Sequence, residues 1–141
     1  MEYQDIEAIL KNYMGKEDVE FDKPTEQEWD ELACLTNCNF SEEFKMFIEL
    51  MSVWMFPGDI YNVATENNNG NDTIAIVYQH ELKYGNWKKE MVPFYGIGNG
   101  DYFCISALDS KVYYYYGDME SYEEYCDNFE MWINRLPEIL E

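Results

Sequence analysis

The sequence predicts an α+β fold, with a central antiparallel β-meander flanked by N-terminal and C-terminal helices. The meander is indicated by residues 91–118, MVPFYGIGNGDYFCISALDSKVYYYYGD, where short apolar and aromatic runs are separated by turn residues. Apolar side chains at spacings of three and four indicate helices before and after this stretch. A chain of 141 residues is within the usual range of one domain, so we expect residues 1–141 to form a single domain.

Helices are expected before the meander. Residues 2–14 carry apolar side chains on one helical face, and Gly15 is expected to end that helix. Thr25 and Glu28 have the spacing of a capping box, which predicts a short helix after Thr25. Ser41 is expected to cap a further helix. Its apolar stripe, which predicts core packing, is formed by Phe44, Phe47, Ile48 and Met51.

The stretch that follows gives a less uniform signal. Ile60–Ala64 predicts a strand. Residues 72–84 fit two structures: their β-branched side chains favour a strand, whereas Asp72 as a cap and Gly85 as a terminator favour a helix. We expect the helix and keep the strand as the alternative.

The meander itself predicts strands over Met91–Ile97, Asp101–Ser106 and Lys111–Tyr116. Gly98-Asn99-Gly100 supplies the positive-φ residues of a tight turn between the first two. A symmetric loop between the second and third strands predicts four cross-strand pairs. These pairs are Phe103–Tyr114, Ile105–Val112, Cys104–Tyr113 and Tyr102–Tyr115. One face of this hairpin is apolar and the other is rich in tyrosine hydroxyls. Because both faces carry aromatic rings, we expect other parts of the chain to cover each face at least partly.

The chain after the meander divides into an acidic segment and a closing helix. Residues 118–127, DMESYEEYCD, are expected to form an acidic, aromatic loop. Asp127 and Glu130 resemble a capping box for the closing helix. The apolar stripe of that helix is formed by Phe129, Trp132, Ile133 and Leu136.

The chain is strongly acidic. Twenty-nine acidic residues against nine basic ones give a formal net charge of −20. Acids concentrate in residues 1–50 and 101–141, while residues 51–100 are nearly neutral. The negative net charge excludes nucleic acid and anionic membranes as direct partners, because phosphate binding requires basic side chains. A basic protein partner fits the charge, and a solvated acidic surface without a partner is the alternative.

The cysteines and the N-terminus predict a cytoplasmic protein. Cys34, Cys38, Cys104 and Cys126 are expected to be reduced thiols. The start, MEYQDIEAIL, is acidic and lacks the features of a signal peptide. No apolar run approaches the roughly 18 residues of a membrane span.

The sequence lacks recognisable catalytic and metal-binding motifs, and we predict that the protein is not an enzyme and needs no metal or cofactor. His80 is the only histidine, and the spacing of Cys34 and Cys38 does not match a redox or zinc motif. GIGNG at residues 96–100 is better explained as a hairpin turn than as a phosphate loop, because no helix follows it. An enzymatic alternative is a small hydrolase that uses an acidic rim formed by Asp101, Asp118 and Glu120.

The unusual element is the run of four tyrosines at residues 113–116. Alternate residues of a strand point to opposite faces, so two of these rings are expected in the core and two at the surface. Tyrosine is enriched at interface hot spots, and nearby acids steer a basic partner. The predicted partner-binding residues are Asp101, Tyr102, Tyr113, Tyr115, Asp118, Glu120 and Tyr122. The alternative is that the terminal helix and the acidic loop cover the tyrosines.

Four segments together resemble a known family, the SUKH superfamily, which includes the fungal Smi/Knr regulators of cell-wall synthesis and many bacterial immunity proteins. FSEEFKMFIELMS is similar to the family's early helix, and MVPFYGIGNGDYFCIS to its central strand pair. KVYYYYGD and NFEMWINRL resemble its next strand and closing helix. The resemblance covers residues 26–137. The sequence departs from it at Phe40-Ser41, where Leu-Pro is usual, and at residues 52–54, where a glycine is expected.

This resemblance implies an α+β fold and non-catalytic protein binding. It implies most directly an immunity protein that neutralises a cognate toxin, and such toxins are frequently basic nucleases. The alternative implied by the same resemblance is a Smi/Knr-like regulatory or scaffold protein of cell-wall or glucan synthesis, without a toxin partner.

Overall fold

The chain folds around a five-stranded antiparallel sheet, in a computed structural model that describes residues 1–140. The strand order is β3-β4-β5-β6-β7, so neighbours in sequence are neighbours in the sheet. The strands are β3 (Asp59–Ile60), β4 (Met91–Gly98), β5 (Asp101–Ser106), β6 (Val112–Tyr116) and β7 (Ser121–Cys126). A separate two-stranded sheet joins β1 (Gly15–Lys16) to β2 (Trp54–Met55). This arrangement confirms the predicted α+β class.

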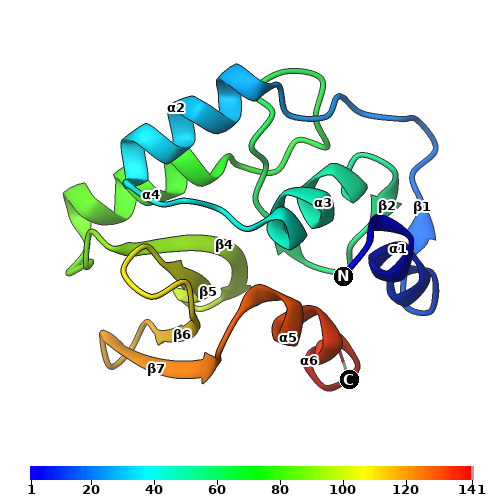
Figure 1. The fold of residues 1–141 in the computed structure, drawn as a ribbon. Coiled ribbons are helices and arrows are strands. Elements are labelled where there is room, and N and C mark those ends of the chain that lie inside the picture. Colours follow the sequence, from blue (N-terminus) through cyan, green and yellow to red (C-terminus); the bar gives the residue numbers. More distant parts are fainter. Residues whose placement is uncertain (141) are drawn as a thin grey trace.

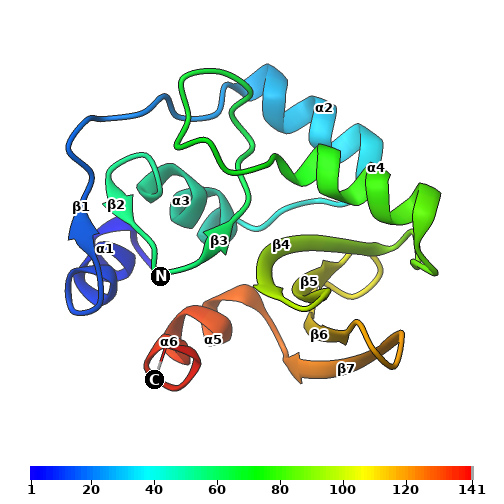
Figure 2. The ribbon, with the colours of Figure 1, turned by 180° about the vertical axis from the view of Figure 1, so that it is seen from behind.

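Helices cover both faces of the five-stranded sheet (Figures 1 and 2). They are α1 (Tyr3–Lys11), α2 (Glu26–Thr36), α3 (Glu42–Leu50), α4 (Ile74–Tyr84), α5 (Phe129–Asn134) and α6 (Leu136–Ile139). In both views α2 lies beside α4, whereas α1, α3, α5 and α6 gather near the two termini. One face of the sheet therefore packs on α3 and α5, and the other on α4 and the segment after it.

The predicted caps are confirmed for two helices and corrected for three. Thr25 and Glu28 form the reciprocal capping box of α2, and Ser41 caps α3. The first helix ends earlier than predicted, with Asn12 at its C-cap, because Gly15 belongs to β1 and pairs with Met55. The remaining two corrections concern α4 and α5, where Thr73 and Asn128 are the N-caps in place of Asp72 and Asp127.

Residues 74–84 are a helix, which resolves the ambiguity in the sequence. Its buried residues are Ile74, Val77 and Tyr78, whose spacing of three and four places them on one helical face. The N–H of Gly85 donates to the carbonyl of Glu81 at 2.9 Å and ends the helix as predicted. The strand predicted at residues 60–64 is much shorter: only Asp59–Ile60 pair with β4.

The register of the meander follows the prediction closely. All four predicted pairs between β5 and β6 are present, from Tyr102–Tyr115 to Ile105–Val112. Asn99 and its flanking glycines have positive φ angles of 56°, 111° and 80°, as the tight turn requires. Pro93 is tolerated inside β4 because an irregularity in the pairing follows it, where a strand can accommodate the missing N–H.

The prediction of a loop at residues 118–127 is wrong. Ser121–Cys126 form β7, which pairs with β6 after a turn in which Glu120 has a φ of 50°. The error has a physical cause. This strand is at the edge of the sheet, where charged side chains reach solvent on either side and protect the edge from pairing with another chain.

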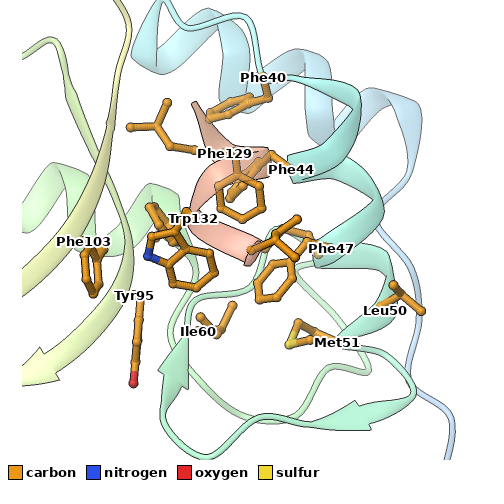
Figure 3. Packing of buried hydrophobic residues seen from close by; sticks show 14 of the residues in the cluster. Phe40, Phe44, Phe47, Leu50, Met51, Ile60, Tyr95, Phe103, Phe129 and Trp132 are labelled. Atoms are coloured by element: carbon orange, nitrogen blue, oxygen red, sulfur yellow. The ribbon is translucent and has the colours of Figure 1, made fainter. Parts of the chain in front are cut away.

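The core is built from aromatic rings that lie between α3, α5 and the sheet (Figure 3). Phe44 and Phe129 meet edge to face at 4.9 Å between ring centroids, and Phe47 meets Trp132 at 5.5 Å. Trp132 is fully buried, and within residues 1–140 its indole Nε1 has no hydrogen-bond acceptor. In Figure 3 that nitrogen lies on the side of the indole toward Phe103, and the centroids of the two rings are 5.7 Å apart.

The closing helix splits into two short pieces. All four residues of its predicted apolar stripe are buried. The break falls at Arg135, because Pro137 has no N–H to donate to the preceding turn. Leu136 is fully buried and fixes α6 against the core.

Replacing Phe44 tests the importance of the aromatic core. Phe44 is fully buried and contacts rings from α2, β4 and α5. We expect Phe44→Ala to lower the free energy of unfolding by about 3–5 kcal/mol, measured by urea denaturation. Leu108→Ala, at a site that is 81% exposed, is the control and should change it by less than about 0.5 kcal/mol. A loss below about 1 kcal/mol for Phe44→Ala would contradict this description of the core.

Candidate functional site

The four tyrosines of β6 divide between the two faces of the sheet, as alternation requires. Tyr113 and Tyr115 lie on the face of Cys104, together with Tyr102. Tyr114 and Tyr116 lie on the opposite face, where their rings are 4.7 Å apart. The tyrosines on the two faces differ in their surroundings.

Three of the predicted contact residues form an internal aromatic cluster. The rings of Tyr102, Tyr115 and Tyr122 surround Trp87 at centroid distances of 5.5, 4.8 and 5.5 Å. Tyr115 is only 5% exposed, so its assignment as a surface contact is corrected: it is a core residue. Burial raises the pKa of Tyr102 to about 12, and it also raises the pKa of Tyr122.

The other tyrosine on this face is only partly covered. Tyr113 donates its hydroxyl to Asp109 Oδ2 at 2.8 Å. This hydrogen bond raises the pKa of Tyr113 and holds its ring at the rim of the sheet. Tyr113 therefore remains a candidate contact residue at the border of the cluster.

Asp101 has a structural position that its sequence context did not reveal. Its Oδ1 accepts the backbone N–H of Gly117 at 2.8 Å, and its Oδ2 accepts the Tyr114 hydroxyl at 2.9 Å. Gly117 leaves no room for a side chain, because a Cβ atom there would lie 2.6 Å from the carbonyl oxygen of Gly100. Asp101 thus ties the start of β5 to the end of β6.

Asp118 and Glu120 lie in the turn between β6 and β7, and both are exposed. Glu120 accepts a hydrogen bond from Asn86 at 3.2 Å, next to the aromatic cluster. The structure therefore brings six of the seven predicted residues around the aromatic cluster and the adjoining turn, while Asp101 extends toward the other face.

The opposite face of the sheet carries a surface groove of about 490 Å³, which we call the aromatic–acidic groove. It lies between the sheet and α6. Five aromatic side chains line it: Tyr95, Phe103, Tyr114, Tyr116 and Tyr125. Two isoleucines and three carboxylates complete it: Ile97, Ile139, Glu123, Glu124 and Glu138.

The charges around this groove are only partly compensated. Glu124 forms an ion pair with Lys111 at 2.9 Å. Glu123 accepts the hydroxyl of Tyr116 at 3.2 Å. Across residues 1–140, neither Glu123 nor Glu138 has a basic side chain within ion-pair distance. The groove therefore combines aromatic rings with carboxylates whose charge is free to attract a cation.

The tyrosine hydroxyls of the groove stay protonated at neutral pH. Burial, and next the hydrogen bond to Asp101, raise the pKa of Tyr114 to about 12. The pKa values of Tyr116 and Tyr125 are also raised, with burial as the largest cause. These neutral rings present the electron-rich faces that cations prefer.

Four residues of the groove are not among the contact residues predicted from the sequence: Tyr116, Glu123, Tyr125 and Glu138. The signal for two of them was present: in β7, Glu123 and Tyr125 alternate with Tyr122 and Glu124. Because residues 118–127 are predicted as a loop, this alternation does not enter the prediction of the site. The contribution of Glu138 depends on how α6 folds back, which no local pattern indicates.

In the part of the chain that the structure describes, His80 and the four cysteines are not among the side chains that line the groove, and Cys104 is buried in the aromatic cluster. His80 is exposed on α4, and its partner there is Glu81 at 3.9 Å. Burial raises the pKa of the Cys38 thiol to about 11 and that of Cys104 well above its usual value. Within residues 1–140, no set of three or more His, Cys, Asp or Glu side chains is arranged to hold a metal ion. None of the helices in that part of the chain is both long and apolar enough to span a membrane.

The fold and this surface define a helix-flanked antiparallel-sheet domain with an open aromatic and acidic groove. The chain belongs to the SUKH family: the family model SUKH_5, described as SMI1-KNR4 cell-wall, matches residues 5–138. This confirms the family suggested by the sequence motifs. A comparison with curated proteins gives no match.

A solved structure supports the fold independently. The crystal structure of a protein from Pseudomonas syringae pv. tomato superposes with a TM-score of 0.59. The two chains are 17% identical, and the similarity covers 79% of this chain and 81% of that one. At this identity the likeness establishes a shared fold.

Replacing Asp101 separates a structural role from a surface role. We expect Asp101→Ala to lower the free energy of unfolding by about 1–3 kcal/mol, because it leaves the Gly117 N–H and the Tyr114 hydroxyl without their acceptor. Asp118→Ala removes the same charge from an exposed position and should have an effect below about 0.5 kcal/mol. Equal effects in urea denaturation would show that Asp101 acts only through its charge.

The raised tyrosine pKa values predict loss of stability at alkaline pH. An unfolded tyrosine loses its proton near pH 10, whereas Tyr102 and Tyr114 keep theirs to about pH 12 in the folded chain. The folded state therefore binds more protons in this window, and stability falls as pH rises through it. Urea denaturation between about pH 9 and about pH 12 should show this decline, which begins near the unfolded pKa of about 10. The Tyr102→Phe/Tyr114→Phe variant should lose less stability over the same pH range. An identical loss would show that the decline does not come from the raised pKa values of these two tyrosines.

Proposed function

We propose that this chain is a non-catalytic protein-binding domain, and specifically an immunity protein that neutralises a basic toxin. The observation that carries the proposal is the aromatic–acidic groove, where tyrosine rings and uncompensated carboxylates lie together on a chain of net charge −20. Aromatic side chains supply contact area at interfaces, and the acidic surface attracts a basic partner over a distance. A nuclease toxin is one such partner, because binding to nucleic acid requires a basic surface.

The proposal excludes nucleic acid and anionic membranes as direct partners, for the same electrostatic reason. It requires no metal or cofactor, since the contacts it invokes are made by side chains. An immunity protein of this kind acts in the cytoplasm, where its thiols are reduced. Both candidate surfaces contribute: the groove on one face, and Tyr113 with the acidic turn at Asp118 and Glu120 on the other.

A second candidate function is a Smi/Knr-like regulatory or scaffold protein of cell-wall or glucan synthesis. The observation that favours it is the description of the matching family model, which refers to the cell wall. Such a protein uses the same kind of surface on a resident partner. The two candidates therefore differ in the partner and not in the physical basis of binding.

Capture of the partner tests the proposal. We expect the tagged full-length chain, purified from its native host at low ionic strength, to retain a basic protein. Raising the salt from about 0.05 M to about 0.5 M should release it, because screening shortens the reach of surface charges to a few ångströms. A captured protein of acidic or neutral charge that resists salt would contradict the basic-partner proposal.

The identity of the captured protein then separates the two candidates. Expressed alone in a sensitive host, a toxin stops growth, and co-expression of this chain should restore it. A resident enzyme or regulator of wall synthesis does not stop growth in this way. Its recovery would replace the immunity proposal with the regulatory one.

A further inference from the structure

We propose that the aromatic–acidic groove binds an arginine side chain presented by the partner. In this arrangement the guanidinium lies against the ring of Tyr116, and the carboxylates of Glu123 and Glu138 compensate its charge. The inference rests on the proposed function and deepens it, because it names the group that the surface recognises.

The groove has the shape and lining that a long cationic side chain requires. A hollow of about 490 Å³ runs between the sheet and α6. The stem of an arginine is apolar, and Ile97 and Ile139 offer it apolar walls. The charged end then meets aromatic rings and carboxylates in place of bulk water.

The charge of the groove is complementary to this occupant. Of its three carboxylates, Glu124 already has a cation, Lys111. Glu123 and Glu138 have none in residues 1–140. The hydroxyl of Tyr116 donates to Glu123 Oε2 at 3.2 Å, which places the ring and the carboxylate side by side. A cation that contacts the ring of Tyr116 therefore also lies close to the carboxylate of Glu123.

The chain already contains the proposed interaction in its own structure. The guanidinium carbon of Arg135 lies 5.2 Å from the ring centroid of Tyr125, which lines the groove. The Nη1 atom of Arg135 also donates to the carbonyl oxygen of Tyr125 at 2.8 Å. A guanidinium that lies over a tyrosine ring and donates to an oxygen is thus a geometry that the chain already contains beside the groove.

Arginine fits this site better than lysine for two reasons. Its guanidinium is planar and stacks on an aromatic face, whereas an ammonium is compact and strongly hydrated. Its fork of N–H donors can also reach two carboxylate oxygens at once. The site therefore distinguishes the two cations by shape as well as by charge.

The test uses the purified full-length chain, labelled with ¹⁵N and titrated with short capped peptides at low salt. The probes are a glycine–arginine peptide, a matched glycine–lysine peptide and a matched peptide of uncharged citrulline. We expect the arginine peptide to shift the amide resonances of Tyr116, Glu123 and Ile139, with weaker binding of lysine and none of citrulline. Lysine binding as tight as arginine binding would overturn the choice of a guanidinium.

Two double variants separate the groove from the general charge of the chain. Glu123→Gln/Glu138→Gln should weaken arginine-peptide binding at least about fivefold, which corresponds to about 1 kcal/mol. Glu20→Gln/Glu66→Gln removes two charges from exposed positions elsewhere and should leave binding within about twofold. Equal weakening in both would mean attraction by net charge alone and would overturn the groove assignment.

A single variant tests the ring itself. Tyr116→Leu keeps an apolar side chain but removes the aromatic face, so arginine-peptide affinity should fall about two- to fivefold. Unchanged affinity would remove Tyr116 from the site. Concentration-dependent shifts of the same resonances without peptide would identify a second copy of the chain as the occupant and overturn the proposal.

These results are independent of partner capture. Peptide binding at the groove with capture of an acidic partner would refute the proposed function and leave the arginine site intact. Capture of a basic partner whose affinity is unchanged by Glu123→Gln/Glu138→Gln would uphold the function and refute the arginine site.

Discussion

The packing of Trp132 is the interaction on which the rest of the structure depends. Its ring contacts Phe47 of α3, Phe94 of β4, Phe103 of β5 and Phe129 of its own helix. These contacts fix α5 against the sheet, and α6 follows after the single residue Arg135. The position of Glu138 and Ile139 over the sheet, and with it one wall of the groove, is thus a consequence of core packing.

The two faces of the sheet place chemically similar tyrosines in different roles. On one face Trp87 lies among Tyr102, Tyr115 and Tyr122, and its indole N–H donates to the carbonyl of Met91 at 2.8 Å. Those rings stabilise the attachment of the segment after α4. On the other face Tyr114 and Tyr116 extend beyond the core and meet solvent at the groove. Cover by neighbouring elements, and not residue type, decides which tyrosines are available to a partner.

The sequence was sufficient for several features that local rules determine. The register of β5 with β6 follows from a symmetric loop and strict alternation, and the caps at Thr25 and Ser41 follow from side-chain chemistry. It was insufficient for β7, whose carboxylates are typical of loops but equally suit an edge strand. It also could not place Trp87 over Tyr115, because that contact depends on how α4 packs against the sheet.

The acidic edge strand admits two physical explanations, and the lining of the groove distinguishes them. Charged side chains on β7 prevent edge-to-edge association, which by itself accounts for Glu123 and Glu124. Edge protection, however, requires only charge. It gives no reason for Tyr114, Tyr116 and Tyr125 to form a hollow beside those carboxylates, since exposing aromatic rings at an edge promotes association. We infer that a surface combining both features serves the recognition of a cationic group.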